Sequence, residues 1–213
     1  MEQQLYYRVV RSNRKTVSLR IERDGWVVVR APYRVGKASI DDFVKRHEKW
    51  VYSKLQARKD FVFDLSDGKE LVLFGSTYLI CSGETRLDGN CIYLPDKQRE
   101  EAFIRLLKKF SSEVLTILTR EIARKYGFCY ERIRISSARS RWGSCNRHGV
   151  ISYSFRVAFL TPSLCEYIIV HELCHTKYFN HGKEFWNEVE KILPQSGTLR
   201  KELKKCSGIM NIL

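Results

Sequence analysis

The segment YIIVHELCH at residues 167–175 constrains the fold of this chain more than any other. Two histidines four residues apart lie on one face of a helix, because an α-helix has about 3.6 residues per turn. The imidazoles of His171 and His175 can therefore bind one metal ion, and Glu172 lies beside them, where it can take a proton from a metal-bound water. Apolar residues 168–170 precede the motif, and no charged residue separates Glu172 from His175. The segment predicts a buried helix that carries a metal site.

A catalytic zinc ion commonly has three protein ligands and one open position, so we expect a third ligand. His181, six residues after His175, is the best candidate. Asn180 tolerates left-handed backbone, and a turn there would bring the chain back to the metal. Glu184 and Glu188 are alternative ligands on the next predicted helix. We expect a single zinc ion, because zinc suits neutral imidazole and lowers the pKa of bound water to roughly 7.

The alternative explanation is that these histidines are ordinary core residues. A lone histidine on an apolar stripe is usually a hydrogen-bonded core residue, and we assign His47 this role. Three of the five histidines, however, fall between residues 171 and 181, together with a glutamate in the register of a general base. Coincidence explains that cluster poorly, so we predict a metal site.

A second segment, RSRWGSC at residues 139–145, combines arginines with a tryptophan and a glycine. Arg141 can stabilise an oxyanion or hold a carboxylate or phosphate, and Trp142 can form a wall of the cleft. The alternative is a structural loop, with Trp142 in the core and Gly143 supplying an unusual backbone angle. Residue types alone favour the structural loop.

Composition narrows the class of protein. The chain has 213 residues, 44% of them hydrophobic, which is enough for one sizeable folded domain or two small ones. No apolar run approaches the roughly 18–20 residues of a membrane span, and the N-terminal segment lacks the apolar core of a signal peptide. We therefore expect a cytoplasmic protein with no membrane partner. Seven cysteines without a CxxC argue against a disulfide framework, and we expect most of them to be reduced and buried.

The formal net charge of +14 favours polyanionic partners such as nucleic acid. The alternative is that the charge serves solubility, with only weak non-specific attraction. The basic residues are spread along the chain, and no block of them is typical of a nucleic-acid-binding tail.

Hydrophobic periodicity and turn residues predict short strands and long helices. The predicted strands cover residues 6–10, 16–22, 26–31, 71–74, 77–81, 91–94, 132–136 and 150–155. The first three should form an antiparallel meander. The predicted helices cover residues 37–59, 98–126 and 162–178, and a last amphipathic helix ends at Pro194. We predict an α+β fold in which residues 1–95 form a strand-rich region with one amphipathic helix and residues 96–213 form the catalytic region.

Three sequence blocks together resemble the YgjP-like (DUF45) family of predicted metallopeptidases, which is related to SprT-like and WLM zinc proteases. The blocks are RWGSC at residues 141–145, HELCH at 171–175 and NHGKEFW at 180–186. The resemblance covers nearly the whole chain. Two positions depart from the family pattern, with Cys174 where a small residue such as alanine is expected and Ser154 where asparagine is usual.

The resemblance implies a zincin-like metallopeptidase core, with an active-site helix and a small antiparallel sheet, preceded by the strand-rich region. It implies that His171, His175 and His181 are the metal ligands and that Glu172 is the general base. It also implies a role near the active site for the RWGSC block.

We therefore expect a zinc-dependent hydrolase, acting on a peptide, in which Glu172 activates a zinc-bound water and returns its proton to the leaving amine. The substrate chain is expected to pair with an edge strand near residues 150–155. One alternative is hydrolysis of a nucleotide or another phosphoanhydride, because the net positive charge and Arg141 would favour such a substrate. Another is a nucleic-acid-binding module, or a protease that works at DNA. A third, a thiol hydrolase using Cys145 and His148, rests only on their nearness in sequence.

Overall fold

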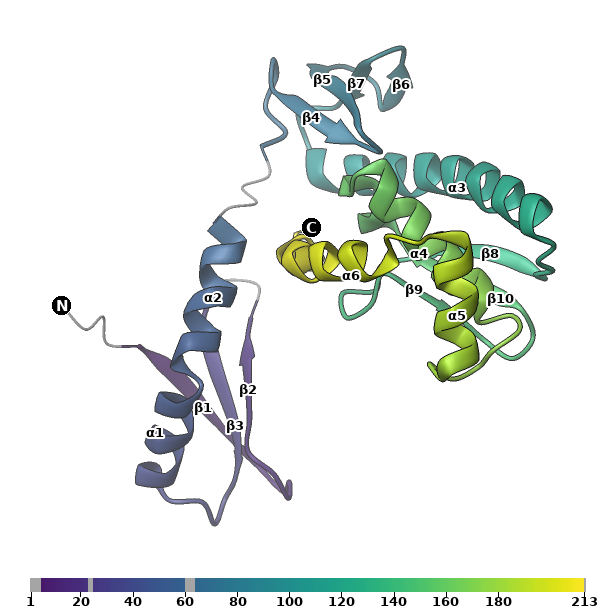
Figure 1. The fold of residues 1–213 in the computed structure, drawn as a ribbon. Coiled ribbons are helices and arrows are strands. Elements are labelled where there is room, and N and C mark those ends of the chain that lie inside the picture. Colours follow the sequence, from purple (N-terminus) through teal and green to yellow (C-terminus); the bar gives the residue numbers. More distant parts are fainter. Residues whose placement is uncertain (1–4, 23–24, 60–63, 213) are drawn as a thin grey trace. The chain divides into compact units, whose positions relative to one another are not determined.

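The computed structural model describes residues 5–22, 25–59 and 64–212. The chain divides into two compact units, Met1–Val62 and Phe63–Leu213 (Figure 1). Each unit has a hydrophobic core of its own. Helices and small sheets occur in both units, so the α+β class is confirmed.

The first unit contains one three-stranded sheet. Its strands are β1 (Tyr7–Ser12), β2 (Ser18–Ile21) and β3 (Val27–Pro32), in the order β1-β3-β2. β3 pairs in parallel with β1 and antiparallel with β2, so the predicted meander is wrong. The physical reason is burial: β3 has the most apolar sequence of the three, and five of its six residues are buried. A strand of that kind is most stable at the centre of a sheet.

Two helices, not one, follow this sheet. α1 (Lys37–Arg46) and α2 (Glu48–Lys59) are interrupted at His47, which has a non-helical backbone (φ −103°, ψ 5°). The His47 ring is exposed, and its Nδ1 lies 2.7 Å from the carbonyl oxygen of Phe43. The predicted hydrogen bond is therefore present, but the assignment of His47 to the core is wrong. Ile40 and Val44 form the buried side of α1, against β3.

The second unit begins with a four-stranded sheet. Its strands are β4 (Glu70–Leu73), β5 (Ser76–Ser82), β6 (Arg86–Asp88) and β7 (Cys91–Leu94), in the order β4-β5-β7-β6. The sheet packs on the long helix α3 (Arg99–Tyr126) and on the 3-10 helix η1 (Phe155–Phe159). The sequence-based boundary at residues 95 and 96 thus differs from the division at residues 62 and 63. These strands share a core with α3, including Ile80, Ile92 and Phe103, and pattern alone cannot reveal that packing.

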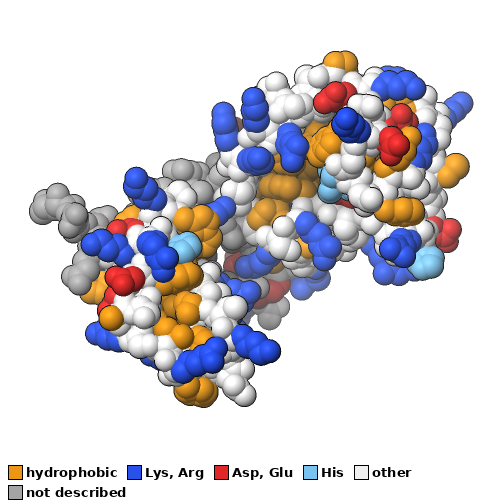
Figure 2. Space-filling model, turned by 60° about the horizontal axis from the view of Figure 1, so that its bottom comes forward, with side chains coloured by type: hydrophobic (Ala, Val, Ile, Leu, Met, Phe, Trp, Pro, Cys, Tyr) orange, Lys and Arg blue, Asp and Glu red, His pale blue; other side chains and the backbone are white. Residues whose placement is uncertain are grey.

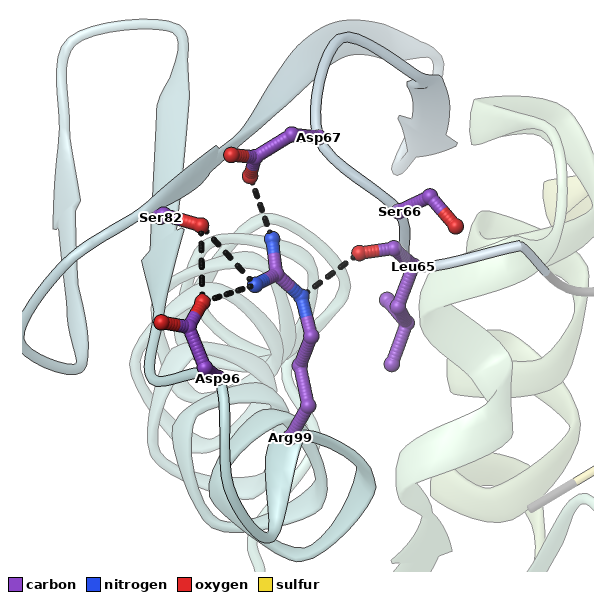
Figure 3. Close-up of a pocket in the computed structure, with 6 residues that line it drawn as sticks. All are labelled: Leu65, Ser66, Asp67, Ser82, Asp96 and Arg99. Atoms are coloured by element: carbon purple, nitrogen blue, oxygen red, sulfur yellow. Dashed lines mark hydrogen bonds and ion pairs between the residues drawn. The ribbon is translucent and has the colours of Figure 1, made fainter.

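Arg99, in the first turn of α3, ties the helix to the sheet (Figure 3). Its guanidinium donates to the carbonyl oxygen of Leu65 at 2.7 Å, to a carboxylate oxygen of Asp67 at 2.6 Å and to the hydroxyl of Ser82 at 3.2 Å. The Asp96 carboxylate is 3.6 Å away. These residues line a surface pocket, and because the arginine already has these partners we interpret it as a structural clamp.

A three-stranded sheet carries the second sequence motif. Its strands are β8 (Arg132–Ser136), β9 (Gly143–Cys145) and β10 (Val150–Ser154), in the order β8-β10-β9. β10 pairs in parallel with β8 and antiparallel with β9, so the sheet is mixed and the expected antiparallel sheet is wrong. β9 lies at one edge, and its three residues were predicted to be loop. A strand this short gives too little alternation to be recognised.

Helices form the rest of the second unit. They are α4 (Pro162–Cys174), α5 (Lys183–Ile192), α6 (Ser196–Lys205) and the 3-10 helix η2 (Cys206–Asn211). α4 packs against α3, α5, α6 and β9, which places it at the centre of this unit. Pro162 occupies the first turn of α4, after Thr161 as N-cap, as predicted. α6 was not predicted, because a proline such as Pro194 commonly follows the end of a helix.

All seven cysteines are free. Only Cys165 and Cys174 are buried, however, so the expectation that most would be buried is wrong. Across the described residues 5–22, 25–59 and 64–212, no helix has both the length and the apolar character that a membrane span requires.

Candidate metal centre

Helix α4 presents the first two histidines. It is apolar on nearly every side, and Ile169, Val170 and Leu173 are fully buried. A helix of this kind is stable only in the interior of a unit, where its side chains have fixed rotamers. The helix ends at Cys174, earlier than the predicted residue 178, and His175 is its C-cap. The Nδ1 atom of His175 lies 2.9 Å from the carbonyl oxygen of Tyr178, a contact that orients the ring.

The turn after α4 returns the chain to the same face. The amides of Lys177 and Tyr178 both donate to the carbonyl oxygen of Cys174, at 3.1 and 2.9 Å. The predicted left-handed backbone at Asn180 is wrong: in the described residues, positive φ outside glycine occurs only at Phe74 and Gln98. The tight turn at the end of α4, rather than a left-handed residue at Asn180, brings the chain back to this face.

The three histidine side chains converge. The Nε2 atom of His181 lies 3.1 Å from the Nε2 atom of His171 and 3.1 Å from that of His175. Candidate ligand atoms from all three rings lie within 4.8 Å of one another. Tetrahedral zinc with Zn–N bonds of 2.0–2.1 Å places its nitrogen ligands about 3.3 Å apart. The chemistry and the spacing of this donor set therefore fit one zinc ion.

Burial favours the neutral form of the His171 and His181 imidazoles. The pKa of His171 is lowered to about 3, chiefly by desolvation and with smaller contributions from His175, His181 and Arg200. The pKa of His181 is lowered by the same cause, with contributions from His175 and Arg200. A neutral ring is the form that binds a metal, so the surroundings favour the ligand state.

Glu172 is buried beside the histidines, with 4% of its surface exposed. Burial raises its pKa to about 8, and the positive charge of Arg141 acts in the opposite direction. Within the described part of the chain, neither Glu172 Oε2 nor His171 Nδ1 has a hydrogen-bond partner, although both are buried. A buried carboxylate oxygen without a partner is costly, unless a bound group or water occupies its surroundings.

The RWGSC block lies against Glu172. A Cβ atom on Gly143 would lie 2.5 Å from Glu172 Oε1 and 2.7 Å from its Cγ, so only glycine fits where β9 passes α4. Gly143 does not have a positive φ, and its role is this close approach rather than an unusual backbone angle. Trp142 is half-buried rather than in the core, and Arg141 is exposed. The structure thus brings the second motif to the edge of the histidine site.

The chain is similar to a known family of metallopeptidases. A model described as "YgjP-like, metallopeptidase domain" matches residues 15–206. The chain belongs to the YgjP-like metallopeptidase family. Comparison with curated proteins finds no match.

One solved structure similar to the chain is the "Crystal structure of the metallopeptidase zymogen of Pyrococcus abyssi abylysin". The two share 24% sequence identity, and the match covers 42% of this chain and 90% of that chain. The TM-score is 0.39.

The alternative ligands lie outside the histidine cluster of this YgjP-like chain. Glu184 is exposed, and Glu188 accepts a hydrogen bond from Lys177 at 3.2 Å. The thiol of Cys145 donates to the carbonyl oxygen of Asn146, and burial raises its pKa to about 11. A thiol with such a pKa is protonated at neutral pH, which disfavours the thiol-hydrolase hypothesis.

Two sets of contacts that support the YgjP-like site were not predicted from the sequence. The Trp186 indole stacks on His181, and the Arg200 guanidinium lies 4.5 Å from the centroid of that indole. Arg156, only 1% exposed, donates to the carbonyl oxygens of Ser137 and Ala138, which lead into the RWGSC block. The position of Arg156 within the apolar run FRVAFL was the sequence feature that could have indicated a buried structural role. Arg200 had no such signal.

On the surfaces of both units drawn in Figure 2, blue Lys and Arg side chains are more common than red Asp and Glu. This agrees with the formal net charge of +14.

Proposed function

We propose that this chain is a zinc-dependent peptidase that holds one zinc ion through His171, His175 and His181 and uses Glu172 as its general base. The observation that carries the proposal is the convergence of three imidazole nitrogens, with separations of 3.1 Å, next to a buried carboxylate. Family membership supports a peptide as the substrate. The seven free cysteines suit a reducing compartment such as the cytoplasm.

Each residue has a distinct role in this mechanism. A bound zinc ion supplies Lewis acidity, which activates water and polarises a carbonyl group. Glu172 accepts a proton from the attacking water and passes it to the leaving amine. Burial of Glu172 suits this role, because a carboxylate shielded from bulk solvent keeps the transferred proton within the site. The exposed Arg141 is near enough to act on the charge of Glu172, and we assign it to binding a substrate carboxylate or the developing oxyanion.

The substrate chain pairs, in our proposal, with the outer edge of β9. The expectation that it pairs with residues 150–155 is wrong, because β10 lies between β8 and β9 and has a neighbour on both sides. β9 has β10 on one side only, and its Gly143 touches Glu172. An extended peptide added to this edge would bring a carbonyl group close to the general base.

The decisive experiment measures zinc content and turnover in matched variants. The zinc-loaded protein should contain one ion per chain and cleave an unfolded protein such as casein. E172Q keeps the side-chain shape but cannot accept the proton, so it should retain zinc and lose turnover by at least about 100-fold. H181A should lose most of its bound zinc. Full activity of E172Q, or undiminished zinc in H181A, would contradict the assignment.

A substrate panel separates the peptidase from its main rival. The same zinc-loaded protein is offered unfolded proteins, a peptide library and nucleoside triphosphates. Cleavage of peptides that disappears in E172Q supports the proposal. Hydrolysis of triphosphates alone, also lost in E172Q, would keep the site and replace the substrate.

A further inference from the structure

The first unit presents a second surface with recognisable chemistry. Alternation along β3 directs Val29 and Ala31 toward α1, where they join the core of this unit. Val28 and Arg30 therefore point to the opposite face, since successive side chains of a strand alternate. We call this opposite side the outer face of the sheet.

Strand register assembles arginines on the outer face. Arg8 of β1 and Arg20 of β2 both pair with Val28, so they flank it in one row across the sheet. Arg30 lies on β3 in the next row, between Val10 and Ser18. All three arginines are exposed. Three guanidinium groups from three different strands thus share one side of a small sheet.

Aromatic residues lie among these arginines. Trp26 immediately precedes β3 and is 40% exposed, and the guanidinium carbon of Arg8 lies 4.0 Å from the centroid of its ring. Tyr6, two residues before Arg8, is 72% exposed. Among the described residues 5–22 and 25–59, the acidic residue Glu22 shares this side of the sheet, and its amide donates to the carbonyl oxygen of Trp26. The side chains of the outer face are therefore mainly basic and aromatic.

The sequence of this unit has the same bias. Residues 1–62 contain 15 Lys and Arg but only seven Asp and Glu. The metal site of the second unit uses none of these residues. The outer face is therefore not explained by the proposed peptidase chemistry.

We propose that the outer face of the β1-β3-β2 sheet binds single-stranded nucleic acid, independently of the metal site. Arg8, Arg20 and Arg30 contact phosphates, and bases stack on the Trp26 indole and the guanidinium above it. A sheet face with exposed rings suits unpaired bases, whose ring faces are accessible, better than a duplex, whose bases are stacked on one another. Anionic lipids and acidic peptides carry negative charge but no bases that could stack. The Arg8–Trp26 pair offers a surface for stacking, so it favours nucleic acid as the ligand.

Binding is tested by fluorescence anisotropy with the full-length zinc-loaded protein and a labelled oligothymidylate of about 15 nucleotides. The variant R8A/R20A/R30A should bind at least about 10-fold more weakly, and its log–log salt slope should fall by about 2, since each lost phosphate contact removes about 0.7. The matched control K45A/R46A/K49A removes the same charge from exposed positions on the helices. It should stay within about twofold of the wild type, apart from the long-range effect of charge.

Trp26 tests the stacking component. W26A should weaken binding by about fivefold or more, and W26F should restore most of the loss. Equal weakening in both triple variants would overturn the proposal, because it would show attraction by net charge alone. So would equally tight binding of polyglutamate or of phosphatidylglycerol vesicles.

Two further controls keep the result interpretable. Thermal unfolding checks that R8A/R20A/R30A is folded; if it is not, single variants R20A and R30A should each weaken binding by about twofold or more. Peptide cleavage should be unchanged in the outer-face variants, and E172Q should bind the oligonucleotide normally. The two proposals can therefore fail separately.

Discussion

The indole ring of Trp186 stacks on the imidazole of His181, with ring centroids 5.5 Å apart and 24° between the planes. His181 is the one histidine of the three that comes from a loop, and it is exposed. The other two are on α4 or at its C-cap. Trp186, on the first turn of α5, therefore restrains the candidate ligand that lies outside a helix. Arg200 of α6 covers the same indole.

Replacing Trp186 should weaken zinc binding. W186A removes the ring that restrains His181, and supporting residues of this kind typically contribute about 10-fold or more to metal affinity. W186F keeps an aromatic face and should retain most of that affinity. A competitive titration against a chromophoric chelator measures the difference. W50A, which removes an exposed tryptophan of α2, is the control and should bind zinc as the wild type does.

A methyl group at Gly143 should disable the enzyme without removing its metal. In G143A the added Cβ would overlap Glu172 Oε1, which must move away from its position beside the histidines. We expect turnover to fall by about 100-fold and the free energy of unfolding by about 1–3 kcal/mol, with zinc still bound. G197A is the matched control, since nothing lies within 4 Å of the added Cβ on α6. Wild-type turnover in G143A would show that Glu172 is not held as described.

Arg156 should be a major source of stability. Its Nε donates to the carbonyl oxygen of Ile212 at 2.8 Å, and one terminal nitrogen donates to those of Ser137 and Ala138 at 3.2 and 3.4 Å. R156A would leave these acceptors without the arginine and create a cavity, so we expect a loss of about 3 kcal/mol in urea denaturation. R134A, at an exposed position of β8, should change stability by less than about 0.5 kcal/mol. A small effect of R156A would mean that water replaces the guanidinium.

Thiol labelling should follow the burial of the cysteines. Cys129 is exposed and should react first with a thiol reagent, whereas Cys165 and Cys174 should react only after unfolding. Burial raises the pKa of both buried thiols to about 12, so even at pH 9 they remain protonated and unreactive. Mass spectrometry of the labelled peptides identifies the order. Early labelling of Cys174 would contradict the packing of α4.

The candidate site was largely predictable because its key spacing is local. Two histidines four residues apart share a face of any helix, and His181 lies only six residues further along the chain. The hairpin of β4 and β5, the extent of α3 and the start of α4 were also predicted, since each depends on neighbouring residues such as Gly75, Gly127 and Pro162. These features need no knowledge of what packs against them.

Other features depend on partners distant in the sequence. The central position of β3, the pairing of β10 on both sides and the shared core of β7 and α3 all result from burial that a local pattern does not encode. The same is true of Gly143, whose need for glycine arises from Glu172 on another element. Residue types could not decide between a structural and a functional role for the RWGSC block, because the deciding contact spans two elements.

By itself, then, the sequence determined the identity and spacing of the candidate metal ligands, because helical periodicity relates residues within one turn. Only the tertiary structure decided which strand edge adjoins Glu172, which ring restrains His181, and that three arginines share one face of the N-terminal sheet. The reason is physical: contacts between elements depend on how their apolar faces are buried together, and that is a property of the whole folded unit.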